Sequence, residues 1–262
     1  MLNFKNAGMG RNHSRLPGGS WAEGPQEGGI FPNRSAFSAA APNSVVQAGR
    51  GGDENQVTPF QHRVNPFDRS RLKGHKPAVL WFTGLSASGK STIANEVEWQ
   101  LNSLLQAHTV LLDGDNLRTG LTGDLGFSVV DRKENNRRVG QVAKLMTEAG
   151  IITLVALISP FRQDREKARA LFGEVEFIEI YLKCSQSVCE ARDPKGLYRL
   201  AKAGKIDQFT GITSPYEPPL NPQILLDTER TEMKECVAKV LGYLEAGNIF
   251  PTRYSQVGSA WR

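Results

Sequence analysis

The sequence predicts an α/β fold: a parallel five-stranded sheet with helices on both of its faces. Five short apolar runs occur along the chain, and the segments between several of them repeat apolar residues at spacings of three and four. Strands that alternate with helices form parallel sheets, and they are apolar throughout because both faces are covered. The predicted strands are AVLWFT (78–83), TVLLD (109–113), IITLVALI (151–158), FIEIYL (177–182) and ILLD (224–227).

Three of the intervening or following segments have a clear helical pattern. The first helix is predicted to begin at Ser91, and the last lies near the C-terminus. The middle helix is expected to start at Asp131, an N-cap acid followed three residues later by Glu134, and to end at Gly150. The apolar faces consist of Ile93, Ala94, Val97, Leu101, Leu104 and Leu105 in the first helix, and of Met233, Val237, Val240, Leu241 and Leu244 in the last.

Length and charge restrict the class of protein. A chain of 262 residues fits one domain with appendages, and its longest apolar stretch, 151–158, is far shorter than the ~18 residues that suggest a membrane span. We therefore expect no membrane helix. The net charge of +5 fits nucleic acid, a membrane surface or small polyanions as partners and does not separate them.

The cysteines indicate a reducing compartment. Cys184, Cys189 and Cys236 are odd in number and show no CxxC spacing, and only four histidines accompany them. Reduced thiols in a cytoplasmic protein, with no metal site, are the expected state.

The two ends of the chain differ in composition from its middle. Residues 1–53 hold ten of the 26 glycines and have no apolar periodicity, so we expect a disordered tail. The predicted folded domain spans residues 54–250, and residues 251–262 form a C-terminal tail. The N-terminal segment has no apolar core typical of a secretory signal. Organellar targeting stays open, although Glu23 and Glu27 argue against it.

One motif at the junction of the first strand and first helix carries specific chemistry. Gly84, four residues, Gly89, Lys90 and Ser91 match G-x-x-x-x-G-K-[ST], the phosphate-binding P-loop. Its backbone N–H groups and the helix N-terminus hold phosphates, Lys90 reaches the β and γ phosphates of ATP, and Ser91 ligates Mg²⁺. The residues expected to bind ATP here are Gly84, Ser86, Ala87, Ser88, Gly89, Lys90, Ser91 and Thr92. GTPases, motor ATPases and small-molecule kinases share this loop, so it does not name the acceptor.

Several further blocks resemble one family of kinases. These blocks are LDGDNLRTGL, LGFSVVDRKENNRRVGQVAKL, LVALISPFRQDR, FIEIYL, VCEARDPKGLYRLAKAGKIDQFTGITSPYE and LLDT. Their order and spacing resemble those of the adenylylsulfate kinase (APS kinase) family, and the resemblance runs from about residue 56 to residue 244. The resemblance implies a P-loop NTPase-type three-layer fold with a mobile lid. It also implies the Mg²⁺-dependent transfer of phosphate from ATP to the 3′-hydroxyl of adenosine 5′-phosphosulfate (APS), which yields 3′-phosphoadenosine 5′-phosphosulfate (PAPS).

The DGD block follows the second predicted strand, where doubly wound folds build their sites. The resemblance places Asp115 near the acceptor hydroxyl, as a base or to position a magnesium-bound water. For Asp113 an ordinary Asp-Gly turn is an equally good interpretation. Lys90, Asp115 and Ser159 are the predicted catalytic residues. Ser159 is expected to bind and position APS, and the resemblance implies that a phosphoserine can occur there.

The remaining substrate contacts are implied by the resemblance. Arg118, Arg132 and Asn135 would hold the phosphosulfate and ribose of APS, as guanidinium forks suit tetrahedral oxyanions. Phe127 and Phe209 would sandwich the adenine, although either alone is more typical of a core. Ile158, Ser159, Lys195, Leu197 and Thr210 complete the predicted APS site, and Arg192 is expected beside the ATP base.

Basic residues around these positions have simpler interpretations. Arg137 and Arg138 lie on the same helix and fit a solvated face, as do Arg199, Lys202 and Lys205. The segment that carries the last three has glycines at 196, 204 and 211 that could act as lid hinges.

The chain departs from the family pattern at three positions. Ala87 replaces a frequent glycine and should cost little if its φ is negative. Thr119 replaces a histidine, which removes a hydrogen bond near the acceptor site. Asn136 stands where an apolar residue is usual, and nothing in the sequence explains it.

Two other functions remain open at this level. A P-loop kinase for another alcohol, such as gluconate, shikimate or a nucleoside monophosphate, would explain the P-loop but not the other blocks. Against a non-catalytic nucleotide sensor or a nucleic-acid binder, Lys90, Ser91 and Asp115 are all intact, and no nucleic-acid module is recognised. The chain has no room for the ATP sulfurylase that makes APS, so that enzyme is expected as a separate protein. A homodimer is implied by the resemblance alone.

Overall fold

The computed structural model describes residue 60 and residues 62–173 and 176–250. The predicted tails, residues 1–53 and 251–262, lie outside the described residues, as do residues 54–59 at the start of the predicted domain. Within the described part of the chain, no helix is long and apolar enough to cross a membrane.

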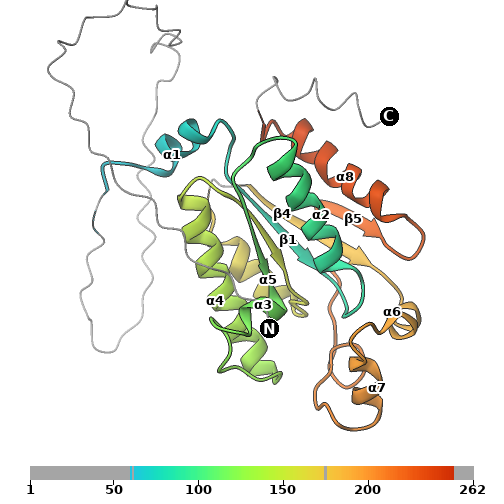
Figure 1. Cartoon of the computed structure of the whole chain (residues 1–262). Helices are drawn as coiled ribbons and strands as arrows, with labels where there is room; N and C mark the ends of the chain where they lie inside the picture. The colour runs from blue at the N-terminus through green and yellow to red at the C-terminus, as the bar shows by residue number, and fades with distance from the viewer. Residues whose placement is uncertain (1–59, 61, 174–175, 251–262) are drawn as a thin grey trace, which may run out of the picture. The chain divides into compact units, whose positions relative to one another are not determined.

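A parallel sheet of five strands forms the centre of the domain, as the sequence predicts (Figure 1). The strand order is β2-β3-β1-β4-β5, and every neighbouring pair is parallel. The strands are β1 (Ala78–Thr83), β2 (Thr109–Asp113), β3 (Ile152–Ala156), β4 (Glu176–Lys183) and β5 (Ile224–Asp227). This order places the end of β1 between the ends of β3 and β4.

Strand β3 is shorter than predicted. The strand ends at Ala156. The Leu157 N–H still donates to the Phe82 carbonyl of β1 at 3.2 Å, whereas the Ile158 carbonyl accepts a hydrogen bond from the Thr83 hydroxyl at 2.8 Å. The predicted run 151–158 therefore divides into a strand and the beginning of a loop at the carboxyl edge of the sheet.

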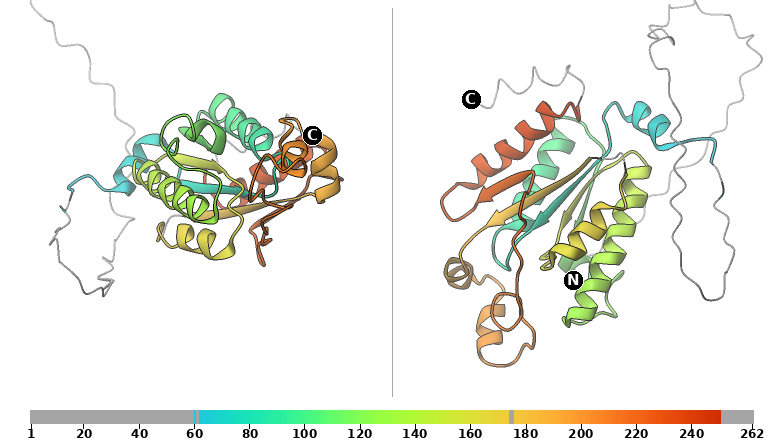
Figure 2. Two further views of the ribbon diagram at one scale, coloured as in Figure 1. Left: turned by 90° about the horizontal axis from the view of Figure 1, so that it is seen from below. Right: turned by 180° about the vertical axis from the view of Figure 1, so that it is seen from behind.

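Helices cover both faces of the sheet (Figures 1 and 2). On one face, α2 (Lys90–Ser103) and α8 (Met233–Ala246) pack against Leu80 and Phe82 of β1. On the other face, α4 (Val129–Glu148) and α5 (Arg162–Arg169) pack against Val79 and Trp81. Alternate residues of β1 thus enter two different cores, which explains why the whole strand is buried and apolar.

The remaining helices are short. They are α1 (Pro66–Lys73), α3 (Gly114–Leu117), α6 (Gln186–Arg192) and α7 (Leu197–Lys202). Asn65 and Asp68 form a capping box at the start of α1, and the Arg69 guanidinium donates to the Glu148 carbonyl at 3.0 Å, which joins α1 to the end of α4.

The predicted start of the middle helix is wrong by three residues. Ser128, not Asp131, is the N-cap of α4, because the Ser128 hydroxyl accepts the Asp131 N–H at 3.1 Å. The same hydroxyl donates to the Asp131 carboxylate at 2.7 Å. Asp131 therefore belongs to the first turn. The helix ends before Gly150, as predicted, and this glycine adopts a left-handed φ of 81°. Helix α2 begins at Lys90, one residue before the predicted start.

A buried ion pair joins α5 to the sheet and to the site edge. The Arg165 Nε lies 2.6 Å from the Glu179 Oε1 of β4, and the Arg165 side chain is only 3% exposed. Its two terminal nitrogens donate to the carbonyls of Ser159 at 2.7 Å and Glu217 at 2.8 Å. The Arg165 guanidinium therefore connects four segments: α5, β4 and the loops that carry Ser159 and Glu217.

We predict that Arg165→Met lowers the free energy of unfolding by about 3 kcal/mol, since it leaves a buried carboxylate without its main partner. Urea unfolding followed by circular dichroism measures this loss. Arg137→Met is the matched control, because Arg137 pairs with Glu134 on the surface, and its stability should equal that of the wild type. Equal stability of the two variants would show that the Arg165 network does not support the fold.

Candidate active site

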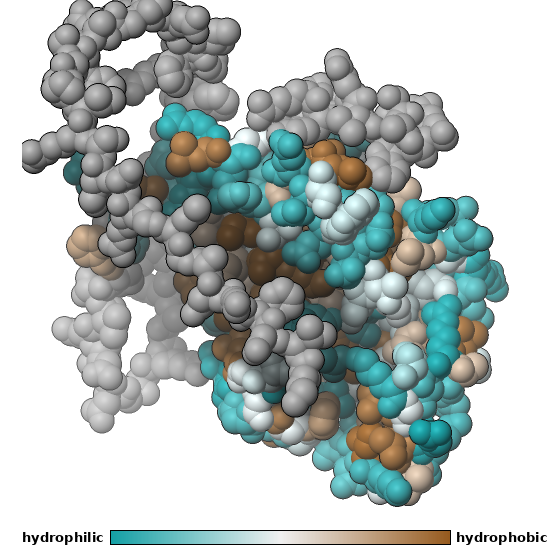
Figure 3. All heavy atoms as spheres, in the orientation of Figure 1, coloured by the Kyte–Doolittle hydropathy of each residue, from teal (hydrophilic) through white to brown (hydrophobic). Residues whose placement is uncertain are grey.

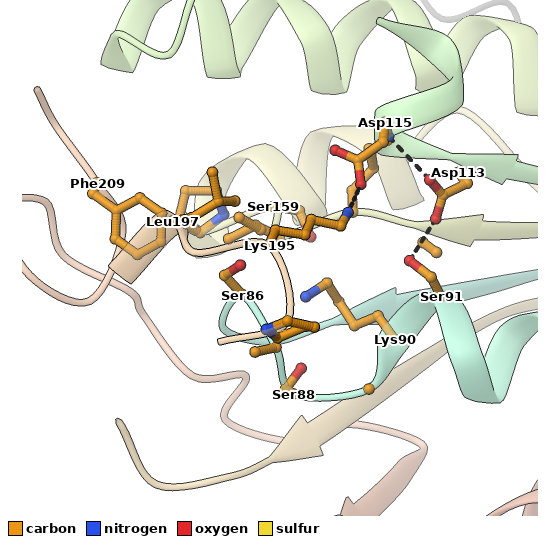
Figure 4. Close-up of a pocket in the computed structure, with 18 of the residues that line it drawn as sticks. Ser86, Ser88, Lys90, Ser91, Asp113, Asp115, Ser159, Lys195, Leu197 and Phe209 are labelled. Carbon is orange, nitrogen blue, oxygen red and sulfur yellow. Dashed lines mark hydrogen bonds and ion pairs between the residues drawn. The ribbon is translucent and has the colours of Figure 1, made fainter. Parts of the chain in front are cut away.

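A cavity of about 1150 Å³ opens at the carboxyl ends of the strands, the edge where doubly wound sheets bind ligands (Figure 4). Its wall combines the loop after β1, the Asp113–Asp115 turn, the start of α4, the loop after β3 and the segment from Arg192 to Phe209. Most of the residues predicted from the sequence therefore meet in one place.

The P-loop has the backbone conformation that its glycines allow. Gly84 has a φ of 157°, and a Cβ there would lie 2.8 Å from the Leu182 carbonyl oxygen. Only glycine lets the loop pass so close to β4. Gly84 itself does not line the cavity, but the seven other predicted P-loop residues, Ser86 through Thr92, do.

Ala87 has a left-handed φ of 60°. The expectation that alanine costs little stability at this position required a negative φ, and the structure does not meet that requirement. A Cβ in this region costs roughly 1–2 kcal/mol relative to a right-handed conformation. The P-loop therefore holds its shape against local strain at Ala87. The sequence alone could not reveal the sign of this angle.

Lys90 is buried beneath the P-loop. Its side chain is 8% exposed, and its ammonium donates to the Leu85 carbonyl at 2.6 Å. Burial lowers the pKa of Lys90 to about 8, and the nearby carboxylate of Asp113 opposes the shift only in part. A bound phosphate group would place a negative charge against the Lys90 ammonium, whose hydrogen-bond partner in this structure is a neutral carbonyl.

Asp113 has a larger role than a simple turn. Its carboxylate accepts the Ser91 hydroxyl at 2.6 Å and the Asp115 N–H at 3.0 Å, and the residue is 8% exposed (Figure 4). A P-loop serine beside a strand-end aspartate is the oxygen donor set that holds Mg²⁺ against nucleotide phosphates. The described residues contain no cluster of three or more His, Cys, Asp or Glu side chains suited to a metal. Ser91 and Asp113 thus fit a magnesium ion that takes its other ligands from phosphate and water.

Asp115 and Lys195 form an ion pair across the cavity. Lys195 extends from the segment between α6 and α7 toward Asp115 in α3 (Figure 4). Both side chains are more than half exposed, at 63% for Asp115 and 55% for Lys195. An exposed pair of this kind is easily exchanged for contacts with a ligand.

Arg118 and Arg132 lie close together without a carboxylate partner in the described structure. The Arg118 Nη1 donates to the carbonyls of Leu125 at 2.9 Å and Gly126 at 3.2 Å. Arg132 donates from Nε to the Phe127 carbonyl at 3.0 Å and from Nη2 to the Gln208 carbonyl at 3.1 Å. Burial lowers the pKa of Arg132 to about 10, and the charge of Arg118 adds to the effect.

Both guanidinium groups also face the ring of Phe127, at 4.2 Å for Arg118 and 5.8 Å for Arg132. The hydrogen-bond partners of these two cations are neutral carbonyls, and the carboxylates of Asp115 and Asp131 act on Arg118 through their charge alone, so the positive charge is compensated only in part. This end of the cavity is therefore suited to an oxyanion.

The loop after β3 places Ser159 at the base of the cavity. The residue is 2% exposed, has a positive φ of 39° and accepts a hydrogen bond from the Trp81 Nε1 at 3.1 Å. No basic side chain of the described residues contacts its hydroxyl. This environment agrees with a positioning role, and Ile158 and Asn135 line the cavity beside it.

The two predicted adenine-stacking residues line the same cavity but differ in their surroundings. Phe127 is half exposed, whereas Phe209 is 5% exposed and packs edge-on against Tyr198, with ring centroids 4.9 Å apart. Phe209 is thus both a core residue and a wall of the cavity. Leu197 also lines the cavity, while Thr210 does not. The Thr210 hydroxyl is buried without a partner, and its backbone pairs with Ser214.

The predicted lid segment contacts the P-loop directly. The Tyr198 hydroxyl donates to the Ser86 carbonyl at 3.1 Å. Arg192 donates to the Thr228 carbonyl at 2.6 Å, and the Thr228 hydroxyl donates to the Ser88 carbonyl at 2.9 Å. Thr228 lines the cavity, and sequence reasoning missed it although the LLDT block contains it.

The other basic residues divide into two groups. Arg137, Arg138 and Lys202 form surface ion pairs away from the cavity, in agreement with a solvated face. Lys205 lines the cavity, contrary to that interpretation. Thr119 also lies outside the cavity wall and donates to the Asn116 carbonyl at 2.6 Å.

The P-loop between the first strand and the next helix of a five-stranded parallel sheet, with a cavity above it, matches the fold of P-loop kinases. The family model described as adenylylsulphate kinase matches residues 76–227. The chain belongs to the adenylylsulphate kinase family.

Individual relatives agree with this placement. The adenylyl-sulfate kinase of Oceanobacillus iheyensis is 56% identical over 182 residues, which cover 70% of this chain and 91% of that protein. The adenylyl-sulfate kinase of Geotalea daltonii is 51% identical over 194 residues, which cover 74% and 95%. The structure of the Mycobacterium tuberculosis APS kinase in complex with AMPPNP and APS is 44% identical, with a TM-score of 0.63, and the match covers 65% of this chain and 99% of that one.

We predict that ATP affinity falls as the pH rises above about 8, the pKa of Lys90 in the ligand-free protein. Burial depresses this pKa, so the ammonium that meets the phosphates is lost in this range, well below the pH at which an ordinary lysine loses its charge. Titration with a fluorescent ATP analogue from pH 7 to 9.5 measures the effect. Lys90→Met should bind weakly and show no such pH dependence. A constant wild-type affinity up to pH 9.5 would contradict the prediction.

Proposed function

We propose that this protein transfers the γ-phosphoryl group of ATP to the 3′-hydroxyl of APS, giving PAPS and ADP. One observation supports the proposal most strongly. The P-loop with Lys90 and the guanidinium groups of Arg118 and Arg132 line one cavity, and so does Asp115, whose charge acts on both Lys90 and Arg118. A cavity with two cationic ends and a carboxylate between them suits two polyanionic nucleotides.

The ATP end consists of the P-loop and its neighbours. Backbone N–H groups of the loop and the N-terminus of α2 would bind the phosphates, and Lys90 would neutralise the β and γ oxygens. Arg192 and Thr228 would lie beside the adenine, since they close the cavity behind Ser88. Ser91 and Asp113 would hold Mg²⁺, which, when bound, neutralises charge that develops on the phosphates.

The APS end consists of the residues at the start of α4 and the loops around them. Arg118 and Arg132 would bind the phosphosulfate, and Asn135, Ile158 and Ser159 would position the ribose. Phe127 and Phe209 would enclose the adenine, and Leu197 would contact it from the lid. For Thr210 we propose an indirect role, because it supports the loop that carries Phe209 and does not line the cavity.

Transfer would proceed in line, without a covalent intermediate. The 3′-oxygen attacks the γ-phosphorus, the bond to the bridging oxygen of ADP breaks, and the proton of the hydroxyl passes to the Asp115 carboxylate. Lys195 would leave Asp115 when APS binds and move to an oxygen of the substrates. This exchange frees the carboxylate at the moment when an acceptor is present, and closure of the lid excludes water.

The cellular setting is part of the proposal. The chain would act as a cytoplasmic homodimer that receives APS from a separate ATP sulfurylase. Its polyanionic substrate accounts for the basic net charge without a nucleic-acid partner.

The proposed function is tested by incubating the purified full chain with ATP and APS, with and without Mg²⁺, and by separating PAPS from APS chromatographically. Adenosine 5′-monophosphate, gluconate and shikimate serve as alternative acceptors. We expect PAPS only with APS and Mg²⁺. Turnover of another alcohol, or binding of APS without product, would replace the proposal by a different kinase or by a nucleotide sensor.

We predict that Asp115→Asn lowers kcat at least about 100-fold, because it removes the proposed proton acceptor. The KM for ATP should change little. Steady-state kinetics with APS and ATP measures both constants. Asp124→Asn is the matched control, since Asp124 pairs with Arg138 on the surface outside the cavity, and it should retain wild-type kinetics. Full activity in Asp115→Asn would exclude Asp115 as the base.

A further inference from the structure

Asn136 is a buried polar residue that the sequence could not explain. It is 3% exposed, it lines the cavity, and its side chain forms no hydrogen bond with any described residue. Its Nδ2 is closed off from solvent and has no acceptor. A buried amide without partners destabilises a protein, so such a group requires an explanation.

The position of Asn136 on α4 gives that explanation. It follows Arg132 by four residues, so the two side chains lie on the same face of the helix, with Asn135 beside them. All three side chains are buried at the cavity wall. Asn135 also has an unpaired amide oxygen, whereas Arg132 is held by two carbonyls. The cavity end of α4 therefore carries two amides, each with a buried atom that no described residue pairs with.

A role confined to the protein core does not account for this arrangement. Thr153 of β3 also has a buried hydroxyl without a partner, but it does not line the cavity. Asn136 also has a buried polar atom without a partner among the described residues, but unlike Thr153 it lines the cavity. A side-chain amide can turn about its last bond and present either its donor or its acceptor end. A ligand against α4 can therefore satisfy it.

We infer that Asn136 is a further acceptor-binding residue, whose side-chain amide hydrogen-bonds to an oxygen of the acceptor nucleotide beside the contacts of Arg132 and Asn135. This inference rests on the proposed function and deepens it. The residue at this position adds one polar contact with the acceptor, at the expense of stability in the ligand-free protein.

The experiment compares Asn136→Leu with the wild-type chain in two measurements. Removal of an unpaired buried amide should raise the melting temperature of the ligand-free protein. Loss of one hydrogen bond should raise the KM for APS about threefold to tenfold and leave the KM for ATP unchanged. Thr153→Val is the matched control, because it removes a buried unpaired hydroxyl away from the cavity. It should keep wild-type kinetics whatever its effect on melting temperature.

Each outcome is decisive. An unchanged KM for APS in Asn136→Leu overturns the inference, and so does an equal loss of kcat/KM for both substrates, which indicates general distortion. If Asn136→Leu does not fold, Asn136→Ala takes its place, with the same expected rise in the KM for APS. Failure of the wild type to form PAPS would instead reject the proposed function, so the two failures are distinguishable.

Discussion

Positive charge at the carboxyl edge of the sheet, which neighbouring carboxylates compensate only in part, is the constraint on which the site depends. Burial lowers the pKa of Lys90, Arg118 and Arg132, which means that the fold holds three cations at some cost in solvation. Their hydrogen-bond partners are mainly backbone carbonyls, which fix the direction of each side chain without cancelling its charge. The cavity is therefore organised for anions before any ligand arrives, and catalysis can rest on positioning and charge neutralisation.

The surrounding fold holds the P-loop and the loop that carries Ser159 in place. Gly84 lets the P-loop pass against β4, and Arg165 ties α5, β4 and the loop that carries Ser159 together. The segment from Arg192 to Phe209 has fewer anchors. It reaches the rest of the site through the Tyr198 hydroxyl, the Arg192 guanidinium and the exposed pair of Lys195 and Asp115. Gln208 adds two hydrogen bonds to the start of α4. That this segment closes over the substrates as a lid stays a prediction from the sequence.

The sequence predicts those parts of the molecule that depend on local patterns. The five strands follow from short apolar runs, and β1, β2 and β5 have the predicted bounds. The P-loop is equally local. The role of Asp113 is not, because it depends on Ser91, a residue 22 positions away that the fold brings within 2.6 Å. The sign of φ at Ala87 depends on how the loop passes β4. The cap of α4 was predictable in principle, since Ser128 precedes Asp131 by three residues, the spacing of a capping motif.

The central claim is that the guanidinium groups of Arg118 and Arg132 bind the phosphosulfate of the acceptor. Isothermal titration of APS into the wild type and into Arg132→Met tests it directly, with Arg137→Met on the exposed face of the same helix as control. The account predicts that Arg132→Met binds APS at least about tenfold more weakly, while it binds ATP as the wild type does and Arg137→Met is unchanged. Equal affinity of Arg132→Met and wild type for APS would contradict it.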